Sequence, residues 1–178
     1  MITVEMPSLM SAEAVEVVEL VGAGRLRGIV LHKLMEEFLT GELKDDEAAA
    51  VQRAAALLNE IEMAAVTQRP HANELGRTAY RTLHLPEIAA LRPSLVAEVP
   101  IWGREGVDYL AARGDAVAIE EDAVTAVVDW KSDVEPSAGE HAAYVGQLED
   151  YCRASGAPRG VLVYMTRGTV HRVKVPKA

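Results

Sequence analysis

The 178-residue sequence predicts an α/β protein in which a mixed central sheet is flanked by helices and preceded by a helical N-terminal portion. Three observations support this class. Apolar residues recur at helical spacing through the first half of the chain. From about residue 95, short apolar runs rich in valine alternate with glycines and acids, as strands and turns do. A helical segment then separates the last two runs from the others, which favours strands of mixed direction.

The helical portion covers about residues 1–90 and contains four expected helices. Ser11 can cap the first helix, and a wide apolar stripe marks the second. The third combines an acidic first turn, Asp45 to Glu47, with an alanine-rich run, and both features favour a helix. The expected bounds are Ser11 to about Leu20, Arg27 to Thr40, Lys44 to about Val66, and the segment after Pro70 as far as Leu83.

The expected sheet and its flanking helix occupy about residues 95–178. Valine-containing runs predict strands because β-branched residues suit a pleated, half-buried surface. Glycines and an acidic turn separate the first runs, and Arg167-Gly168 separates the last two. The expected strands are 95–102, 107–111, 115–119, 124–130, 160–165 and 170–175, with a helix at 138–154. We expect all 178 residues to form a single domain.

Composition excludes several classes of protein. Apolar residues make up 49% of the chain and charged residues 25%, as in ordinary globular proteins. A formal net charge of −9 argues against a protein that coats nucleic acid generally. The single cysteine, Cys152, excludes an intrachain disulfide and any metal site built mainly of thiolates. We find neither a secretory signal nor an apolar run of the ~18 residues a membrane span needs, so we expect a cytoplasmic protein.

Two aspartates are predicted to face each other on one hairpin. If a three-residue loop follows Glu120, that residue pairs with Val124, and Asp115 falls opposite Asp129. Lys131 then projects from the same face. Paired carboxylates suit a hard divalent ion, and a neighbouring lysine can orient a water or offset negative charge. A two- or four-residue loop would place the acids on opposite faces, and from this hairpin alone solvated acids are the simpler interpretation.

Five short motifs follow one another between about residues 27 and 165. They are Gly28-x-x-x-His32, Glu98-Val-Pro, Asp115, Asp129-Trp-Lys131 and Gln147-x-x-x-Tyr151. In this order they resemble the nuclease domain of the RecB/AddA type, which belongs to the PD-(D/E)XK superfamily. The resemblance implies a restriction-endonuclease-like core. The chain departs from the family at Ala112, where a glycine is usual and Gly114 stands nearby instead, and Gly106-Val-Asp108 is a rival for the first aspartate.

The resemblance also implies a metal site. Asp115 and Asp129 would be metal ligands, and His32 would be a further ligand. The main-chain carbonyl of Trp130 would complete part of the shell, and Lys131 would position or activate the attacking water. The implied cofactor is Mg²⁺ or Mn²⁺, because carboxylate and imidazole ligands suit either ion. Taken alone, a histidine in an apolar helix is more typical of a core or boundary residue.

Three other residues acquire roles from the same resemblance. Glu98 would be an active-site acid, either near the metal or supporting it. Gln147 and Tyr151 are four residues apart, so they share a helix face and would help to hold the nucleic acid strand. Taken alone, these residues fit a strand-edge acid and ordinary boundary packing equally well.

The implied activity is metal-dependent hydrolysis of phosphodiester bonds in DNA. The resemblance implies an (exo)deoxyribonuclease that acts on a single strand or a duplex end in DNA end processing and recombinational repair. The sequence contains no Gly-x-x-x-x-Gly-Lys-Ser/Thr phosphate loop, so the implied superfamily 1 helicase would be elsewhere in the full-length chain or in a separate subunit. The alternatives are a catalytically inactive module of the same fold that binds DNA or a helicase, and an acidic protein that binds another protein.

Charge is unevenly distributed along the chain. From Cys152 onward there are six basic residues and no acid, although the whole chain is acidic. A bound cation would also offset part of the charge on the proposed ligands. We therefore hypothesise that the C-terminal basic stretch, including Arg167 and Arg172, lies beside the active site.

Overall fold

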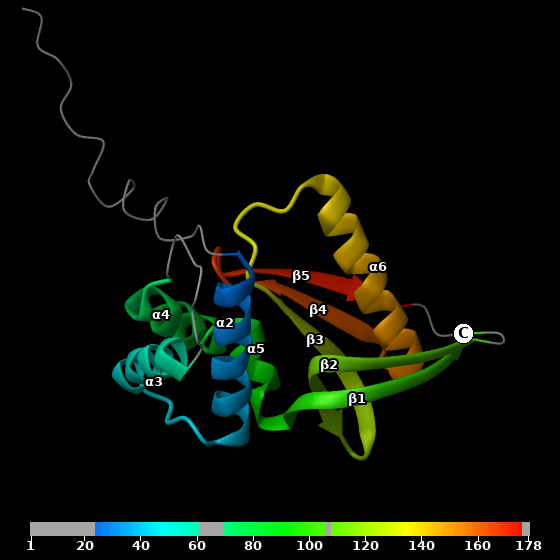
Figure 1. Cartoon of the computed structure of the whole chain (residues 1–178). Helices are drawn as coiled ribbons and strands as arrows, with labels where there is room; N and C mark the ends of the chain where they lie inside the picture. The colour runs from blue at the N-terminus through cyan, green and yellow to red at the C-terminus, as the bar shows by residue number, and fades with distance from the viewer. Residues whose placement is uncertain (1–23, 61–69, 106–107, 176–178) are drawn as a thin grey trace, which may run out of the picture.

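The computed structural model describes residues 24–60, 70–105 and 108–175 (Figure 1). The expected helix at 11–20 and the end of the third expected helix lie outside the described residues. The sheet has five strands in the spatial order β1-β2-β3-β4-β5. They are β1 (Leu95–Glu105), β2 (Asp108–Glu120), β3 (Ala123–Lys131), β4 (Arg159–Tyr164) and β5 (Thr169–Lys174). Strands β3 and β4 are parallel and the other neighbours are antiparallel, which confirms a mixed sheet.

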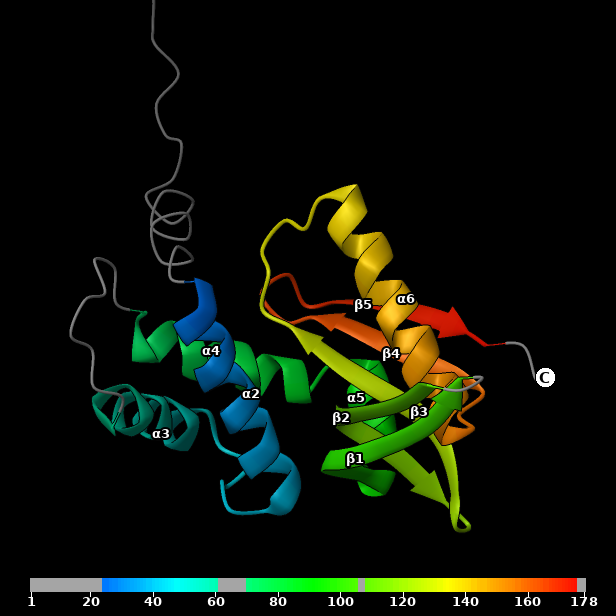
Figure 2. The ribbon, with the colours of Figure 1, turned by 45° about the vertical axis from the view of Figure 1, so that its right-hand side comes forward.

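Helices cover both faces of the sheet (Figures 1 and 2). One side holds α2 (Gly24–Thr40), α3 (Glu47–Glu60), α4 (Ala72–Leu83) and α5 (Pro86–Leu91), and the other holds α6 (Ala138–Ser155), which connects β3 to β4. A Cβ atom at Gly160 would lie 2.5 Å from Leu148, so this glycine allows α6 to pack closely on β4. None of the helices that the structure describes is long and apolar enough to cross a membrane.

Alternation along β3 separates two cores. Val128 and Trp130 pack with the helical portion, whereas Val127 packs with Leu148 beneath α6. Because successive side chains of a strand point to opposite faces, Asp129 shares the α6 face with Val127. The two predicted active-site residues of β3 therefore lie where α6 covers the sheet rather than in the larger apolar core.

Local differences from the expected elements have clear causes. Helix α3 begins at Glu47 because the Asp46 carboxylate accepts a hydrogen bond from the Ala49 amide at 2.7 Å, so Asp46 precedes the helix as a cap. Two short elements were not expected: α5, which starts at Pro86, and the 3₁₀ helix η1 (Arg92–Ser94). Both are too short to produce a recognisable periodicity. The two expected strands at 107–111 and 115–119 form one continuous strand, β2, which pairs with β1 along its length.

The predicted three-residue loop between β2 and β3 is wrong. Glu120 pairs with Ala123, and the two turn residues between them have positive φ angles of 50° and 63°. These angles match the tight hairpin turn that follows the twist of the strands. A bulge then adds Thr125 to β3, so that Ala118 pairs with Ala126. The extra residue restores the register, and the acids share a face although the loop has two residues.

Candidate active site

Three adjacent strands bring three carboxylates together. On β1 and β2, the pairs Ala97 with Ala116 and Val99 with Gly114 flank Glu98 and Asp115. On β2 and β3, Ala116 pairs with Val128. One residue further along this antiparallel register, Asp115 lies opposite Asp129. The strand register therefore places Glu98, Asp115 and Asp129 next to one another on three neighbouring strands.

Asp115 is held by one side chain and one main-chain group. Its Oδ1 atom lies 3.1 Å from Nδ1 of His32, which arrives from α2. Its Oδ2 atom accepts a hydrogen bond from the amide of Trp130 at 2.8 Å. The Trp130 side chain is only 2% exposed and anchors β3 in the larger core. Packing of the Trp130 side chain against the helical portion thus fixes its main-chain amide, and this amide orients Asp115 on the other face of the sheet.

Asp129 is a buried carboxylate whose neutralisation is incomplete. Only 6% of the residue is exposed. Lys131 Nζ donates to Oδ1 at 3.3 Å and forms an ion pair with Oδ2 at 3.0 Å. The geometry of the second contact is not that of a hydrogen bond, so buried Oδ2 has no hydrogen-bond partner. Burial raises the pKa of Asp129 to about 6 although Lys131 acts in the opposite direction. A buried oxygen of this kind can accept a cation.

Burial and nearby carboxylates have opposite effects on the pKa of His32. Burial disfavours its charged form, but the hydrogen bond to Asp115 and the charges of Asp115 and Asp129 outweigh burial, so the pKa of His32 is raised. When it is protonated, the imidazole is a counter-ion for Asp115. Because a metal ligand must be a neutral imidazole, metal binding at this histidine would compete with protonation.

Lys131 is oriented by α6. Its Nζ donates to Gln147 Oε1 at 3.4 Å, and Gln147 Nε2 donates to the Tyr151 hydroxyl at 2.8 Å. The ammonium also lies 4.4 Å from the ring centroid of Tyr144, at the distance of a cation–π contact. Gln147 and Tyr151 do share a helix face, and together they link α6 to the lysine of β3.

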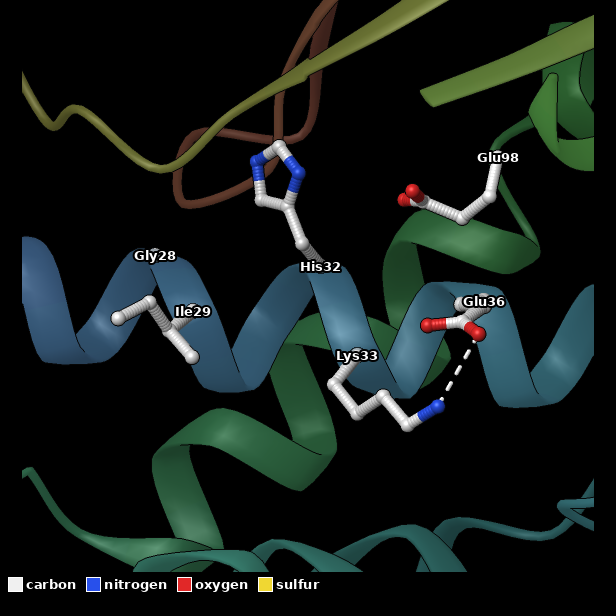
Figure 3. A pocket seen from close by; sticks show the side chains of 6 residues that line it. All are labelled: Gly28, Ile29, His32, Lys33, Glu36 and Glu98. Carbon is white, nitrogen blue, oxygen red and sulfur yellow. Dashed lines mark ion pairs between the residues drawn. The ribbon is translucent and has the colours of Figure 1, made fainter. Parts of the chain in front are cut away.

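Glu98 occupies strained backbone at the edge of a pocket. Its φ angle is 55°, which is uncommon for a residue with a side chain, and its Oε2 atom forms an ion pair with Arg113 at 2.9 Å. Burial raises the pKa of Glu98, with Arg113 acting in the opposite direction. The pocket has a volume of about 460 Å³, and in Figure 3 Glu98 and His32 extend into it from opposite sides. Its lining consists of Gly28, Ile29, His32, Lys33, Glu36 and Glu98.

Sequence reasoning missed a buried support beneath the site. Arg27 is 1% exposed, and its guanidinium donates to the main-chain carbonyl of Ser132 at 2.6 Å and to Glu74 at 2.6 Å. Ser132 follows Lys131 directly, so the hydrogen bonds of Arg27 link α2 and α4 to the end of β3. A Cβ atom at Gly28 would lie 3.1 Å from Ser132 Oγ, which explains the small residue in the Gly-x-x-x-His motif. The sequence signal was an arginine embedded in an apolar helix.

Several sequence-level alternatives are resolved by position. The rival Asp108 pairs with Glu105 at the far end of the β1–β2 hairpin, away from Asp129. A Cβ atom at Gly114 would lie 2.9 Å from Ile101 Cδ1, so the close approach that needs a glycine occurs there and not at Ala112.

The hypothesis that the basic C-terminal stretch lies beside the active site fails for Arg172. Arg172 forms an ion pair with Glu87 of α5, on the face opposite Asp129, so its predicted place beside the site is wrong. Arg167 lies in the β4–β5 turn and pairs with Glu135. Both guanidinium groups therefore already have acidic partners.

The donor set fits a hard divalent ion, although cationic side chains neutralise it here. Within the described residues, no three histidine, cysteine, aspartate or glutamate side chains are grouped closely enough to hold a metal. Lys131 and His32 instead pair with the two aspartates. The buried Oδ2 of Asp129 has no hydrogen-bond donor, and with carboxylate and imidazole groups beside it this oxygen is the feature that suits Mg²⁺ or Mn²⁺.

Comparison with known proteins assigns the family. The crystal structure of SSO0001 is similar over 87% of this chain and 80% of that chain, with 19% sequence identity and a TM-score of 0.39. No curated protein matches the sequence. The model of the PD-(D/E)XK nuclease superfamily matches residues 13–175, which include all five motifs. With its mixed sheet and flanking helices, the chain therefore belongs to the PD-(D/E)XK nuclease superfamily.

Proposed function

We propose that the chain is a divalent-metal-dependent DNA nuclease of the RecB/AddA type that hydrolyses phosphodiester bonds at DNA ends. One observation carries this function. Asp129 is buried beside Asp115 and Lys131, yet one of its carboxylate oxygens has no hydrogen-bond donor. A purely structural acid at this depth would have hydrogen-bond donors to both oxygens, because a buried polar atom without one is costly.

The proposed ligands are Asp115, Asp129, His32 and the main-chain carbonyl of Trp130. When bound, a divalent ion lowers the pKa of its water and stabilises negative charge on the phosphate oxygens. Asp115 is preorganised for this role, since the Trp130 amide holds one oxygen while the other faces His32. Glu98 is proposed to act from the neighbouring strand, as an active-site acid that supports the ligand set.

Lys131 is proposed to orient the attacking water and to stabilise charge on the phosphate. Its ammonium already lies between the Asp129 carboxylate and Gln147, so it does not need to be recruited from solvent. Gln147 and Tyr151 are proposed to contact the DNA strand. Their hydrogen bonds also give them a second effect, which is to hold the Lys131 ammonium in place.

The RecB/AddA assignment extends the proposal to partners. It rests on the five motifs and their order in the sequence, and the family model covers all of them. We propose an exonuclease that acts on single strands or duplex ends in end processing and recombinational repair. Residues 1–178 would form one nuclease domain, and a superfamily 1 helicase in the same full-length chain or another subunit would deliver the strand.

Cleavage assays test the proposed function directly. The purified chain is incubated with end-labelled single- and double-stranded linear DNA in Mg²⁺, Mn²⁺ or chelator. We expect metal-dependent degradation, reduced by about 100-fold or more in Asp129→Asn and in Lys131→Gln. The matched controls are Asp122→Asn, in the exposed hairpin turn, and Lys174→Gln on β5, both of which should keep full activity.

Other outcomes have definite meanings. Full activity of Asp129→Asn would contradict the assigned site. DNA binding without cleavage, with the helicase partner present or absent, would identify an inactive module. If the DNA is neither cleaved nor bound under any of these conditions, the nuclease proposal is wrong. Crystals soaked with Mn²⁺ add an independent measurement, because the proposal requires anomalous density beside Asp115, Asp129 and His32.

A further inference from the structure

A second pocket lies beneath the first turns of α6, at the β5 edge of the sheet. Its volume is about 310 Å³, large enough for part of a nucleotide. The walls come from the segment that precedes α6, from α6 itself and from the β4–β5 hairpin, which lie together in Figure 1. The lining residues are Pro136, His141, Tyr164, Arg167, Thr169, Val170 and His171.

The polar groups of this pocket are mainly hydrogen-bond donors. His141 Nδ1 lies 2.7 Å from the Tyr164 hydroxyl. The hydroxyl donates in this contact when the imidazole carries its proton on Nε2. In that tautomer the Nε2–H group of His141 is left to donate to another partner. The His171 ring stands edge-on to His141, with 4.8 Å between the ring centroids, and adds a second imidazole to the same wall.

Arg167 completes the donor set. Its ion pair with Glu135 joins side chains that are 47% and 78% exposed, and such a pair contributes little and is readily exchanged. Two further acids near the pocket keep their charge but have hydrogen-bond donors of their own, since Tyr144 donates to Asp133 and the Ser137 cap donates to Glu140. Imidazole, guanidinium and hydroxyl donors are the groups that bind phosphate oxygens.

The pocket and the active site lie on the same face of the sheet. Asp129 pairs with Leu162 on β4, and Leu162 pairs with His171 on β5. His171 is therefore two strands from Asp129, about 10 Å across the sheet. A strand with one phosphate at Asp129 can place another phosphate of the same backbone near this pocket.

We propose that the pocket formed by His141, Tyr164, Arg167, Thr169 and His171 binds a phosphate group of the nucleic acid substrate, separate from the phosphate that is cleaved. This inference rests on the proposed function, because it gives the nuclease a second contact with its strand. The contact would hold the strand in register with the active site. The chemistry suits a terminal phosphate, an internal phosphodiester or free phosphate, and experiment distinguishes these sources.

Histidine side-chain NMR tests the pocket without any cleavage. The chain has five histidines, whose side-chain signals can be followed individually. Inorganic phosphate is titrated into the 178-residue chain in the presence of chelator. We expect saturable shifts of His141 and His171, with His71 and His84 unchanged. His171→Gln should weaken phosphate binding about tenfold, since the glutamine amide places its donor at a different position from the imidazole nitrogen. The control His71→Gln changes another exposed histidine and should leave binding unchanged.

Two results of this titration would overturn the proposal. One is a saturable shift of His32 alone, which would put phosphate in the active site. The other is an equal and unsaturable drift of all five histidine signals, which would mean nonspecific binding only. Thermal unfolding of His171→Gln is measured alongside, and Thr169→Val provides a second variant of the same pocket if the first fails to fold.

Oligonucleotide binding then identifies the source of the phosphate. The probes are otherwise identical single strands with and without terminal phosphates, measured by fluorescence anisotropy in chelator. Tighter binding of the phosphorylated strand, lost in His171→Gln, would assign a terminal phosphate. Equal binding of both strands, weakened about tenfold in the variant, would assign an internal phosphodiester. If the variant weakens neither strand, the nucleic acid proposal is wrong, even when free phosphate binds.

These measurements do not depend on catalysis. A protein that binds the strands through His171 but fails to cleave DNA would support the pocket and contradict the nuclease proposal. A protein that cleaves DNA through Asp129, but whose binding of DNA is unaffected by His171→Gln, would support the nuclease proposal and contradict the pocket.

Discussion

Two buried charged side chains, Arg27 next to the end of β3 and Asp129 on β3 itself, differ in how completely the protein hydrogen-bonds them. Arg27 is 1% exposed, and its guanidinium is bonded to Glu74 and to the Ser132 carbonyl. Asp129 is 6% exposed and keeps an oxygen with no hydrogen-bond partner. The first group positions backbone, so its charge is matched by the protein. The second has an ion pair with Lys131 but keeps one oxygen without a hydrogen-bond donor, and such an oxygen can accept a cation.

The largest expected effect on stability comes from Arg27. Arg27→Ala leaves the partly buried Glu74 without its guanidinium partner and removes the buried donor to Ser132, so we expect a loss of about 3–5 kcal/mol in the free energy of unfolding. Urea denaturation measures this loss. As a control, Arg77→Ala removes an exposed arginine of α4 and should change stability by less than about 0.5 kcal/mol. Comparable losses in the two variants would remove the contrast with Asp129.

Neutralising Asp129 should increase the free energy of unfolding, whereas replacing Arg27 should decrease it. Its pKa is about 6 in the folded protein and ordinarily 3.8, so the folded state binds the proton more tightly than the unfolded state. The carboxylate therefore costs little stability below pH 4, increasingly more between pH 4 and 6, and its full cost above pH 6. In chelator at pH 8, Asp129→Asn should stabilise the protein by about 1–3 kcal/mol, while activity is lost.

Denaturation curves at two pH values test this reversal. The stabilisation of Asp129→Asn should disappear at about pH 4, where the wild-type carboxyl is also neutral. Asp122→Asn, in the exposed turn, should show no such pH dependence. A loss of stability in Asp129→Asn at pH 8 would show that the carboxylate is structurally satisfied, and the two buried groups would then be alike.

Metal binding should release protons. The pKa of Asp129 is raised to about 6 and that of His32 is also raised, so below pH 6 both groups hold protons that a metal ligand must give up. We expect Mn²⁺ affinity to fall about tenfold per pH unit for each proton released as the pH drops below 6. Calorimetry in buffers of different ionisation enthalpy counts the protons. Binding that releases none would contradict ligation by these residues.

The smallest expected effect concerns the backbone at Glu98. Its φ angle of 55° suits glycine, so Glu98→Gly should be about 1 kcal/mol more stable than Glu98→Ala although both lose the carboxylate. Urea denaturation of the two variants isolates the strain from the loss of the ion pair with Arg113. Equal stabilities would show that the backbone is relaxed at this position, and the strain would then be no part of the site.

Much of the candidate site was predictable because the order of five short motifs resembles a known family, whereas each motif alone was ambiguous. Asp129-Trp-Lys131 combines an acid and a base on one valine-rich strand, and the predicted helices and strands mostly appear near their expected bounds. Arg27 and Glu74 were missed because they lie 47 residues apart and neither belongs to a recognisable pattern. Their value depends on a buried contact between two helices, which no local periodicity encodes.

The sequence by itself determined the α/β class, the mixed sheet and the order of the motifs along it, because periodicity and turn residues act locally. Only the tertiary structure decided which side chains meet. The turn after Glu120 has two residues, and Thr125 restores the register through a bulge, so the shared face of Asp115 and Asp129 depends on strand pairing. The depth of Asp129 and the approach of His32 likewise depend on packing between elements distant in the chain, where burial sets the electrostatics of the site.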